Sequence, residues 1–356
     1  MGLAIEAVGG WPAVLRPLMA GEDLPAEDAA AALTDILEGE ATPAQIAAFI
    51  TLMRAKGETV EEMTALVRTM LRFAEPIPMP DGVEVLDTCG SGGSEQRRQG
   101  AFNVSTITAL VVAGAGVAVA KHGGRAASAT SSSADVLAAL GVTVELGPAG
   151  VARCVQEAGM GFCFAPRFHP AMRFAAPVRR ELGVPTLFNF VAPMANPARP
   201  RRQVLGVSEP RLAETMLAVL HRNGATDAMV VHGDDGLDEL TTTTTSTVLE
   251  VREDGEVRRY TVDATELGLA RAAPADLRGG DAAANAELAR RVLDGKHGPH
   301  RDIVALNAAA GLVVAGVVGD LAAGVERACV SIDSGQAAGV LDRLVAVSAA
   351  AAAAGD

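Results

Sequence analysis

The second part of the sequence, from Val83 onward, alternates short apolar runs with alanine-rich segments of helical periodicity. The runs expected to form strands are 83–87, 117–120, and the neighbourhoods of 161–165 and 228–232. Helical segments, two of which begin at Ser105 and Ser133, lie between these runs. Parallel strands need long connections, and such connections are usually helical. The alternation therefore predicts an α/β lobe with a central, mostly parallel sheet flanked by helices.

The last third of the chain is expected to add a hairpin and further helices to this lobe. Asp254-Gly255 is a hairpin turn signal, and it joins the runs 247–252 and 256–262 as antiparallel strands. Helical patterns follow at 282–294, 303–315 and 335–347. The alanine-rich stretch 348–354 is expected to be a frayed end.

Residues 25 to about 75 predict a separate, all-helical lobe. Thr42-Pro43 supplies an N-cap and a first-turn proline, and Thr59 with Glu62 matches a capping box. The stretch Pro76–Pro80 is interpreted as a linker or hinge, because proline removes amide donors and disfavours helix. A chain of 356 residues also exceeds the usual single core of about 250–300 residues. We expect a small helical domain, 1–78, joined by helices around 170–200, and an α/β domain formed by 83–168 and 202–350.

Composition and charge argue against several classes of protein. The formal net charge of −13 disfavours a sequence-independent nucleic-acid binder, which needs a basic face. The apolar runs 107–120 and 303–319 are interrupted and are shorter than the roughly 20 residues of a membrane span. Met1–Pro12 lacks the pattern of a secretory signal. We therefore expect a soluble, cytoplasmic protein with no nucleic-acid or membrane partner. The cysteines, expected to be reduced core thiols without metal-binding spacing, are Cys89, Cys154, Cys163 and Cys329.

The loops after the predicted strands carry residues suited to a phosphorylated ligand. Gly90–Ser94 is rich in glycine, which lets the backbone approach a ligand, and a helix start that can donate amides to anions follows it. Lys121–Arg125 supplies two cations and two glycines, and serines follow up to Ser133. Ligands in such sheets bind beyond the carboxyl ends of the strands, so both loops and His232–Glu239 are expected at one edge. A solvated, serine-capped turn is the simpler interpretation of the second loop.

The third loop contains four carboxylates within six residues, at Asp234, Asp235, Asp238 and Glu239. These charges would repel one another unless a cation lies among them. Mg²⁺ is the economical candidate, because it takes few protein carboxylates and completes its shell with water and substrate phosphate. A plain acidic surface turn is the alternative interpretation.

Taken in order, the motifs resemble the anthranilate phosphoribosyltransferase family of tryptophan biosynthesis. The matching segments are Gly90-x-Gly-Gly, Asn103-Val-Ser-Thr, Lys121-His-Gly-x-Arg, Val178-Arg-Arg-Glu-Leu-Gly, Phe188-Asn, Asn196-Pro and Gly236-Leu-Asp-Glu. The resemblance extends from about residue 10 to about residue 345. It implies a nucleoside phosphorylase-like phosphoribosyltransferase fold and a homodimer formed through the helical domain. It also implies transfer of the phosphoribosyl group of PRPP to the amine of anthranilate, with release of pyrophosphate.

The same resemblance implies the residues of the site. Those expected to bind PRPP are Gly90, Gly92, Gly93, Ser94, Asn103, Val104, Ser105, Thr106, Lys121, His122, Gly123, Gly124, Arg125, Ala126, Ala127, Ser128, Ala129 and Ser133. Those expected at anthranilate are Gly90, Gly124, His169, Met172 and Arg179, with Arg179 holding the carboxylate. Ser105, Asp238 and Glu239 are expected to bind magnesium, as two ions.

The expected chemistry agrees with these residues. Displacement at the anomeric carbon passes through an oxocarbenium-like state, so the departing pyrophosphate needs stabilisation, whereas an aniline-type amine needs no strong base. No residue is assigned as a general acid or base, and Lys121 and Arg125 support the reaction by position and charge. His122 is interpreted as a positioning or lining residue. Only one of the adjacent residues Arg179 and Arg180 can face the cleft. Because the resemblance assigns Arg179 to the carboxylate, Arg180 is interpreted as a surface residue.

The sequence departs from the family pattern at several positions. Ser94 stands where the family has a carboxylate, and Arg97 and Arg98 make the same loop more basic. We hypothesise that one of these arginines approaches the pyrophosphate, and a solvated loop tip is the alternative. Gly124 replaces an asparagine whose amide is implied to contact anthranilate. Met172 and Ala195 also differ from the family near the acceptor.

Three other functions remain as alternatives. The first is a related phosphoribosyltransferase for another aromatic acid acceptor, which the changes near the acceptor would allow. The second is a pyrimidine-nucleoside phosphorylase, which would have less use for the carboxylates of Asp238 and Glu239. The third is a non-catalytic nucleic-acid-binding relative, which the acidic net charge disfavours.

Overall fold

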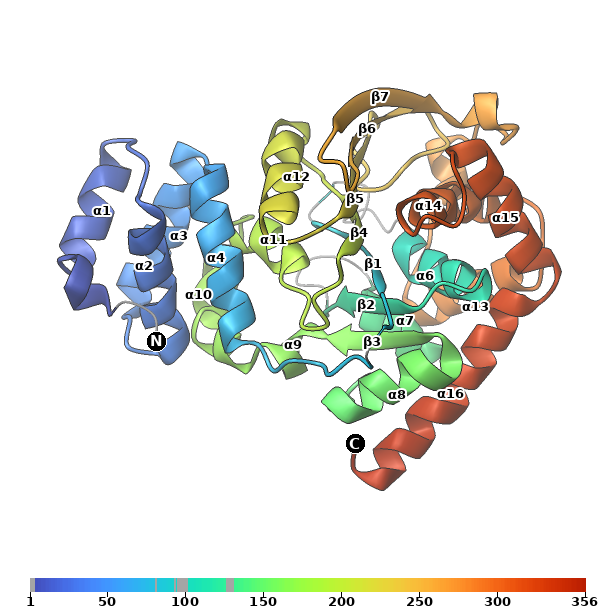
Figure 1. The fold of residues 1–356 in the computed structure, drawn as a ribbon, viewed down its shortest axis with the longest axis horizontal. Helices are drawn as coiled ribbons and strands as arrows, with labels where there is room; N and C mark the ends of the chain where they lie inside the picture. Colours follow the sequence, from blue (N-terminus) through green and yellow to red (C-terminus); the bar gives the residue numbers. More distant parts are fainter. Residues whose placement is uncertain (1–3, 81, 93, 95–101, 126–130) are drawn as a thin grey trace.

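The computed structural model describes residues 4–80, 82–92, 94, 102–125 and 131–356. A helical region at the N-terminal end lies beside a larger part in which helices surround a seven-stranded sheet (Figure 1). This arrangement confirms the predicted fold class.

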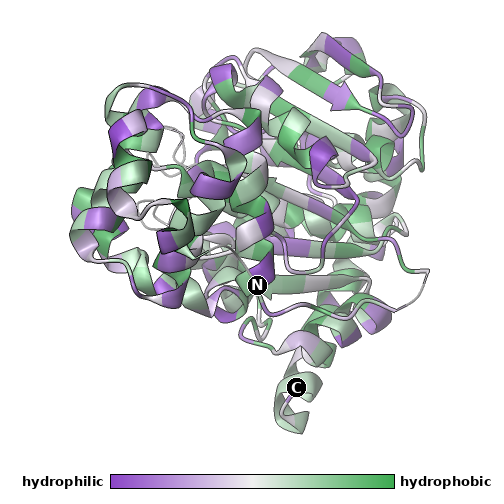
Figure 2. Cartoon of the chain, turned by 60° about the vertical axis from the view of Figure 1, so that its left-hand side comes forward, coloured by the Kyte–Doolittle hydropathy of each residue, from purple (hydrophilic) through white to green (hydrophobic). Residues whose placement is uncertain are grey.

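The described part of the N-terminal region consists of one 3-10 helix and four α-helices, two of which begin at side-chain caps. The helices are η1 (Ile5–Val8), α1 (Trp11–Met19), α2 (Ala26–Glu38), α3 (Pro43–Lys56) and α4 (Val60–Phe73). Thr59 and Glu62 form the predicted capping box at the start of α4. Thr42, predicted as an N-cap, also forms a complete capping box, with Gln45 as its partner. Both hydrophobic and hydrophilic residues line these helices, as burial on one side requires (Figure 2).

A second set of short helices packs against this region from the middle of the chain. The helices are α9 (Ala165–Phe168), η2 (Pro170–Phe174), α10 (Ala176–Leu182), α11 (Phe188–Val191) and η3 (Ala192–Met194). Phe188 and Phe190 from α11 join the same buried cluster as Phe49 of α3. α12 (Ala213–Arg222) also contacts α4, and its Leu217 and Leu220 belong to this cluster.

The sheet places its first five strands in parallel and adds an antiparallel hairpin at one edge. Its order is β3-β2-β1-β4-β5-β6-β7. The strands are β1 (Leu86–Gly90), β2 (Val119–Gly123), β3 (Met160–Phe164), β4 (Arg202–Gly206), β5 (Asp227–Gly233), β6 (Thr245–Val251) and β7 (Val257–Asp263). β4, which lies between β1 and β5 and pairs with both, was not among the predicted strands. Its run is short and begins with the polar pair Arg202-Gln203, so it lacks the continuous apolar signal of its neighbours.

Helices cover the sheet and extend to the C-terminus. They are α6 (Val104–Gly114), α7 (Ser133–Ala139), α8 (Pro148–Ala158), α13 (Ala282–Leu293), α14 (Pro299–Val314), α15 (Leu321–Asp333) and α16 (Gln336–Ala354). The expected frayed end at 348–354 is wrong, because α16 is helical throughout this stretch and buries Ala351. Within the described residues α16 is the one helix that could cross a membrane by length and composition. Such a match is weak evidence, because core helices of soluble proteins pass the same test, and α16 contacts α6, α8 and α15.

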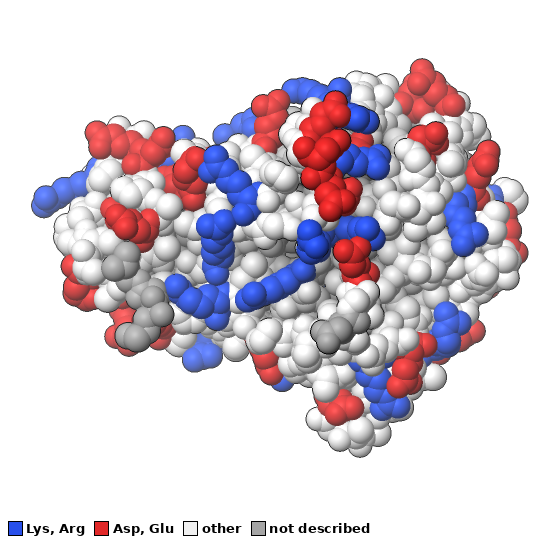
Figure 3. Space-filling view, in the orientation of Figure 1, with Lys and Arg blue, Asp and Glu red and all other residues white. Residues whose placement is uncertain are grey.

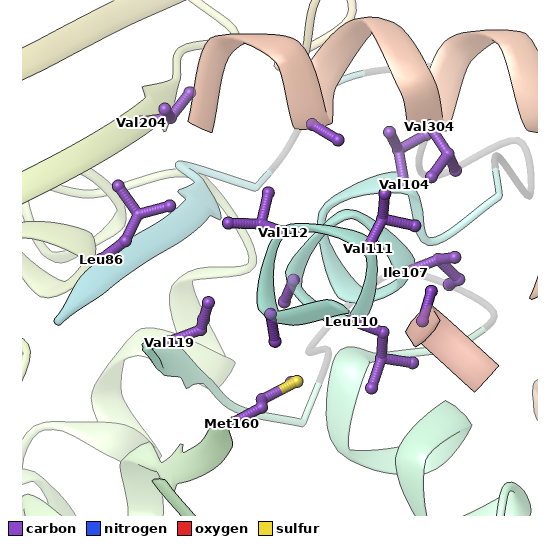
Figure 4. Close-up of a cluster of buried hydrophobic side chains, with 14 of the residues drawn as sticks. Leu86, Val104, Ile107, Leu110, Val111, Val112, Val119, Met160, Val204 and Val304 are labelled. Carbon is purple, nitrogen blue, oxygen red and sulfur yellow. The ribbon is translucent and has the colours of Figure 1, made fainter. Parts of the chain in front are cut away.

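Helix α6 is at the centre of the larger core. Side chains on several sides of it are buried, including Ile107, Leu110 and Val112. Figure 4 shows these residues among strand residues such as Leu86 and others from β2, β3 and β4, with Val304 of α14 nearby. This surrounding core fixes the start of α6 beside the carboxyl ends of the strands.

Charged side chains of both signs are interleaved on the face shown in Figure 3. Arg68 of α4 donates to the carbonyl of Arg222, the last residue of α12, at 2.8 Å. Arg222 in turn pairs with Glu61 at 2.5 Å. These contacts join α4 to the end of α12.

Candidate active site

The three loops identified in the sequence meet beyond the carboxyl ends of β1, β2 and β5. The side chain of Asp238 accepts a hydrogen bond from the backbone N–H of Gly92 at 2.9 Å. Gly92 has a φ of +66°, which glycine adopts without strain. A Cβ at Gly90 would overlap the carboxylate of Asp238. The glycines of the first loop therefore allow the acidic loop to approach the backbone closely.

Glu239 connects the acidic loop to the start of α6. Its Oε1 accepts a hydrogen bond from the backbone N–H of Ser105 at 3.3 Å. The Nζ of Lys121, from β2, lies 3.2 Å from the Oγ of Ser105 and donates to the carbonyl of Thr88 at 2.5 Å. Lys121 is 1% exposed and Glu239 is 3% exposed, so water screens neither charge well. The structure therefore brings the predicted metal ligands and the predicted phosphate-binding lysine together.

The four carboxylates of the acidic loop divide into two pairs. Asp235 accepts hydrogen bonds from the hydroxyls of Thr241 and Thr243, and Asp234 accepts from Thr245. These two aspartates hold the turn that leads into β6. Asp238 and Glu239 are instead buried against the glycine loop and α6. The alternative interpretation, an acidic surface turn, therefore describes Asp234 and Asp235. The predicted magnesium ligands are the other pair, Asp238 and Glu239.

Sequence reasoning missed a buried carboxylate beneath the lysine loop. Asp87 is fully buried, and its Oδ1 accepts a hydrogen bond from the backbone N–H of His122 at 3.0 Å. Its Oδ2 accepts from the side chain of Gln203 on β4 at 3.2 Å. Burial raises the pKa of Asp87, and the nearby charge of Lys121 opposes that rise. Asp87, on β1, thereby fixes the backbone of β2 at His122, next to Lys121.

A second missed group is a buried amide that joins three separate elements. The Nδ2 of Asn285, on α13, lies 2.8 Å from Oδ1 of Asn103 and 2.7 Å from Oγ of Ser131. Asn103 precedes α6, and Ser131 precedes α7. A polar residue on the buried face of α13, between Ala282 and Ala286, was the sequence signal that could have identified it.

Two predicted histidines lie together in the interior. The rings of His122 and His169 have centroids 5.3 Å apart, and each Nε2 is buried with no hydrogen-bond partner among the described residues. Burial lowers the pKa of His169 to about 4, and burial together with His169 and Lys121 lowers the pKa of His122 well below its usual value. Both rings are therefore neutral near pH 7, which suits lining and orientation of a substrate.

The residues predicted at the acceptor come from separate parts of the chain: Gly90 ends β1, Gly124 follows β2, His169 and Met172 lie at η2, and Arg179 lies on α10. Arg179, on α10, is half-buried over the ring of Phe188 at 5.2 Å, and within the described chain it has no carboxylate partner. Burial lowers its pKa. Met172 and His169 line a narrow space whose other walls include Leu37 and Met70 of the helical region. Gly124 has room at its Cβ position, where the nearest atoms are 3.7 Å and 4.0 Å away.

The remaining predicted residues have mixed surroundings. Arg125 is exposed, pairs with Glu145 at 3.1 Å and lies over the ring of Phe164 at 5.7 Å. Ser94 is buried and Ser133 begins α7. Some predicted positions lie outside the described residues, namely Gly93, Arg97, Arg98, Ala126, Ala127, Ser128 and Ala129.

The oxygen atoms near α6 fit a hard divalent cation. Asp238, Glu239 and Ser105 offer carboxylate and hydroxyl oxygens, the ligand type that Mg²⁺ prefers. Among the described residues no group of three or more His, Cys, Asp or Glu side chains forms a self-sufficient metal site. Mg²⁺ is commonly held by one or two carboxylates together with water and substrate phosphates.

Comparisons with known sequences agree along almost the whole chain. The model described as "Glycosyl transferase family, a/b domain" matches residues 82–338, and the helical bundle domain of the same family matches residues 12–74. The anthranilate phosphoribosyltransferase of Nocardioides sp. is 54% identical over 95% of this chain and 99% of its own length. That of Thermomicrobium roseum is 51% identical over 95% of this chain and 97% of its own length.

Solved structures show the same fold. The anthranilate phosphoribosyltransferase of Thermus thermophilus superposes with a TM-score of 0.88 at 42% identity, covering 94% of this chain and 99% of that one. The Saccharomyces cerevisiae enzyme, solved in complex with PRPP and Mg, has a TM-score of 0.85 at 24% identity, covering 96% and 98% of the two chains. At 24% identity, the similarity to the Saccharomyces cerevisiae structure supports the fold alone.

Proposed function

Because this chain belongs to the anthranilate phosphoribosyltransferase family, we propose that it transfers the 5-phosphoribosyl group of PRPP to the amine of anthranilate. The products are N-(5-phosphoribosyl)anthranilate and pyrophosphate, which places the reaction in tryptophan biosynthesis. The observation that carries this proposal is the junction of the acidic loop with the glycine loop and the start of α6, where Asp238 accepts from Gly92 and Glu239 accepts from Ser105.

The transfer is a displacement at the anomeric carbon. The nitrogen lone pair of anthranilate forms the new C–N bond, the bond to pyrophosphate breaks with its electron pair, and the amine proton passes to solvent. The backbone N–H groups of Gly92 and Ser105 already donate to Asp238 and Glu239, so the phosphate oxygens are bound by side-chain donors. One such donor is the Thr106 hydroxyl at the start of α6, which is buried without a hydrogen-bond partner among the described residues. Lys121 supplies a buried positive charge beside them. Positioning and charge stabilisation then account for the rate, without a general base.

Ser105, Asp238 and Glu239 are the residues that would hold magnesium, as two ions. When bound, Mg²⁺ neutralises the negative charge that grows on the departing pyrophosphate. Asp238 reaches this position because Gly90 and Gly206 leave room for it. Asp234 and Asp235 take no part, because their oxygens accept hydrogen bonds from threonine hydroxyls.

The acceptor end is formed by Arg179 and the histidine pair. A guanidinium can hold a carboxylate with two parallel hydrogen bonds, and half-burial of Arg179 strengthens such a pair. The neutral rings of His122 and His169 line the path to the amine. Met172 supplies an apolar contact for the aromatic ring.

The decisive experiment is an assay of the purified chain with PRPP, Mg²⁺ and anthranilate, followed by loss of anthranilate fluorescence. We expect equimolar consumption of anthranilate and release of pyrophosphate, and loss of both on addition of EDTA. Turnover with a ring-substituted acid but not with anthranilate would assign another acceptor. Phosphate-dependent cleavage of a pyrimidine nucleoside would assign the phosphorylase alternative.

We also propose that the enzyme is cytoplasmic and acts as a homodimer through its helical region. Met19, at the end of α1, is 74% exposed, the largest value among the exposed large hydrophobic side chains of the described residues, and is therefore the position chosen to test the dimer. Sedimentation of the wild type against a Met19→Lys variant tests the interface. An unchanged monomeric mass in both would contradict it.

A further inference from the structure

Asn103 occupies the N-cap position of α6 but does not cap the helix with its side chain. An N-cap asparagine ordinarily accepts a hydrogen bond from an amide of the first helical turn. Here its Oδ1 instead accepts from the hydroxyl of Ser131 at 2.8 Å and from Asn285 at 2.8 Å. The amides at the start of α6 are therefore left to other acceptors, and one of them, that of Ser105, donates to Glu239.

Asn285 is the centre of this network. It is fully buried on the first turn of α13, and its Nδ2 reaches Asn103, Ser131 and the carbonyl of Gly280. Its Oδ1 accepts from the backbone N–H of Gly280 at 2.8 Å. A Cβ at Gly279 would overlap the Asn285 side chain, so a glycine is needed there for the amide to fit.

The network spans two elements of the proposed PRPP site that are distant in sequence. Asn103 leads into the Ser105 and Thr106 turn, and Ser131 lies just before α7, the helix that follows β2 in the chain. Ser132 then caps α7 through Asp135, so the position of Ser131 is passed directly to that helix. A satisfied buried network of this kind favours a single geometry, because each unpaired member would be costly.

We propose that Asn285 is a positioning residue, which fixes the distance between the start of α6 and the start of α7 so that Ser105, Thr106 and Ser133 can hold the phosphates of PRPP. This inference rests on the proposed function, and it adds a residue from α13 that touches neither substrate. We expect its effect to fall mainly on the PRPP half, because the acceptor residues Arg179 and His169 lie on other elements.

The test compares Asn285→Asp with the wild type and with Ser331→Ala. The aspartate keeps the shape and the bond from Gly280, but its carboxylate has no proton to donate to Asn103. Ser331 is an equally buried residue whose hydroxyl donates to the carbonyl of Val111 at 2.8 Å, at the far end of α6. It therefore controls for the general cost of losing one buried hydrogen bond.

We expect Asn285→Asp to raise the KM for PRPP and its calorimetric Kd roughly tenfold, with the KM for anthranilate within about twofold of wild type. Ser331→Ala should leave both KM values unchanged. Ser131→Ala removes the hydrogen bonds that the Ser131 hydroxyl makes with Asn103 and Asn285, so it should also raise the KM for PRPP. If the Asn285→Asp chain kept wild-type PRPP binding, the positioning role would be wrong.

Hydrogen exchange separates this result from failure of the proposed function. In Asn285→Asp the amides of 104–106 and 133–136 should exchange faster than in Ser331→Ala, whether or not PRPP is a substrate. Equal exchange in the two variants overturns the inference. Failure of the wild type to bind PRPP, with exchange altered as expected, would overturn the proposed function alone.

Discussion

Gly206, the last residue of β4, lies directly against the backbone of Asp238. A Cβ at Gly206 would overlap the carbonyl oxygen of Asp238, and backbone cannot move aside as a side chain can. The strand that the sequence analysis missed therefore sets the position of a predicted magnesium ligand.

This contact predicts the behaviour of Gly206→Ala. Overpacking of this kind costs about 1–3 kcal/mol, and it must displace the segment that carries Asp238 and Glu239. We expect kcat/KM to fall on the order of 10²-fold, since small misplacements of catalytic groups have effects of this size. Gly319→Ala is the control, because its Cβ would meet no atom within 4 Å. Wild-type kinetics for Gly206→Ala would contradict the placement.

Glu239→Gln tests the assignment of the acidic loop. The substitution removes one of two anionic ligands, so the Mg²⁺ concentration for half-maximal activity should rise roughly tenfold or more. Asp234→Asn is the matched control from the same loop, because Asp234 is exposed and bonds Thr245. The measurement is a magnesium titration of initial rate at saturating PRPP. Equal magnesium dependence of the two variants would place the metal elsewhere.

Arg179→Ala separates the acceptor from PRPP. A hydrogen bond to a charged group is worth about 1.5–3 kcal/mol, so the KM for anthranilate should rise between roughly tenfold and 150-fold. The KM for PRPP should change little. Arg180→Ala, at the exposed neighbouring position, is the control and should leave both constants unchanged. A larger effect of Arg180→Ala would reverse the assignment within the pair.

The histidine pair predicts a loss of stability in acid. Burial lowers the pKa of His169 to about 4, so between about pH 6.5 and pH 4 the unfolded chain binds more protons than the folded one. The stabilising contribution is therefore complete above pH 6.5 and is lost as the pH falls toward 4. Its full size is about 3 kcal/mol.

Urea unfolding of the wild type and of His169→Asn at pH 7 and pH 5 measures this contribution. The variant should lose less stability between the two pH values than the wild type does. His221→Asn, at an exposed position of α12, controls for removal of any histidine. Parallel pH dependence in all three proteins would show that His169 does not titrate as expected.

Sequence patterns predicted the parts of the molecule that have local causes. The capping box at Thr59, the hairpin at Asp254-Gly255 and the loops after β1, β2 and β5 all depend on residues close in sequence. The strand β4 was missed because its burial comes from β1 and β5 on either side, and its own polar start hides this. Likewise, α16 is held as a helix to Ala354 by packing that an alanine run cannot reveal.

Within the candidate site, the motif residues could be predicted but their supports could not. Asp87 and Gln203 meet across neighbouring strands, and Asn285 reaches Asn103 from a helix far along the chain. No local pattern records such pairs, because each depends on the tertiary arrangement. Arg125 is the opposite case. It belongs to a motif that was recognised in the sequence, but in the structure its guanidinium pairs with Glu145 at the surface.

Gly124 predicts how acceptor binding can be improved. The family resemblance implies an asparagine at this position, and its side-chain amide would lie near anthranilate. The structure has room for the Cβ of such a residue, because that atom would meet Ala165 and Pro166 at ordinary van der Waals distances. One added hydrogen bond is worth about 0.5–1.5 kcal/mol. Gly124→Asn should therefore lower the KM for anthranilate by up to about tenfold, with the KM for PRPP within about twofold of wild type.

Gly124→Ala is the matched control, because it adds the same Cβ and restricts the unfolded chain without supplying an amide. We expect it to leave the KM for anthranilate unchanged. If both substitutions lowered the KM equally, backbone restriction rather than a hydrogen bond would be the cause. If Gly124→Asn raised it instead, the acceptor would occupy the space beside Ala165, and the pocket would be shaped around the glycine.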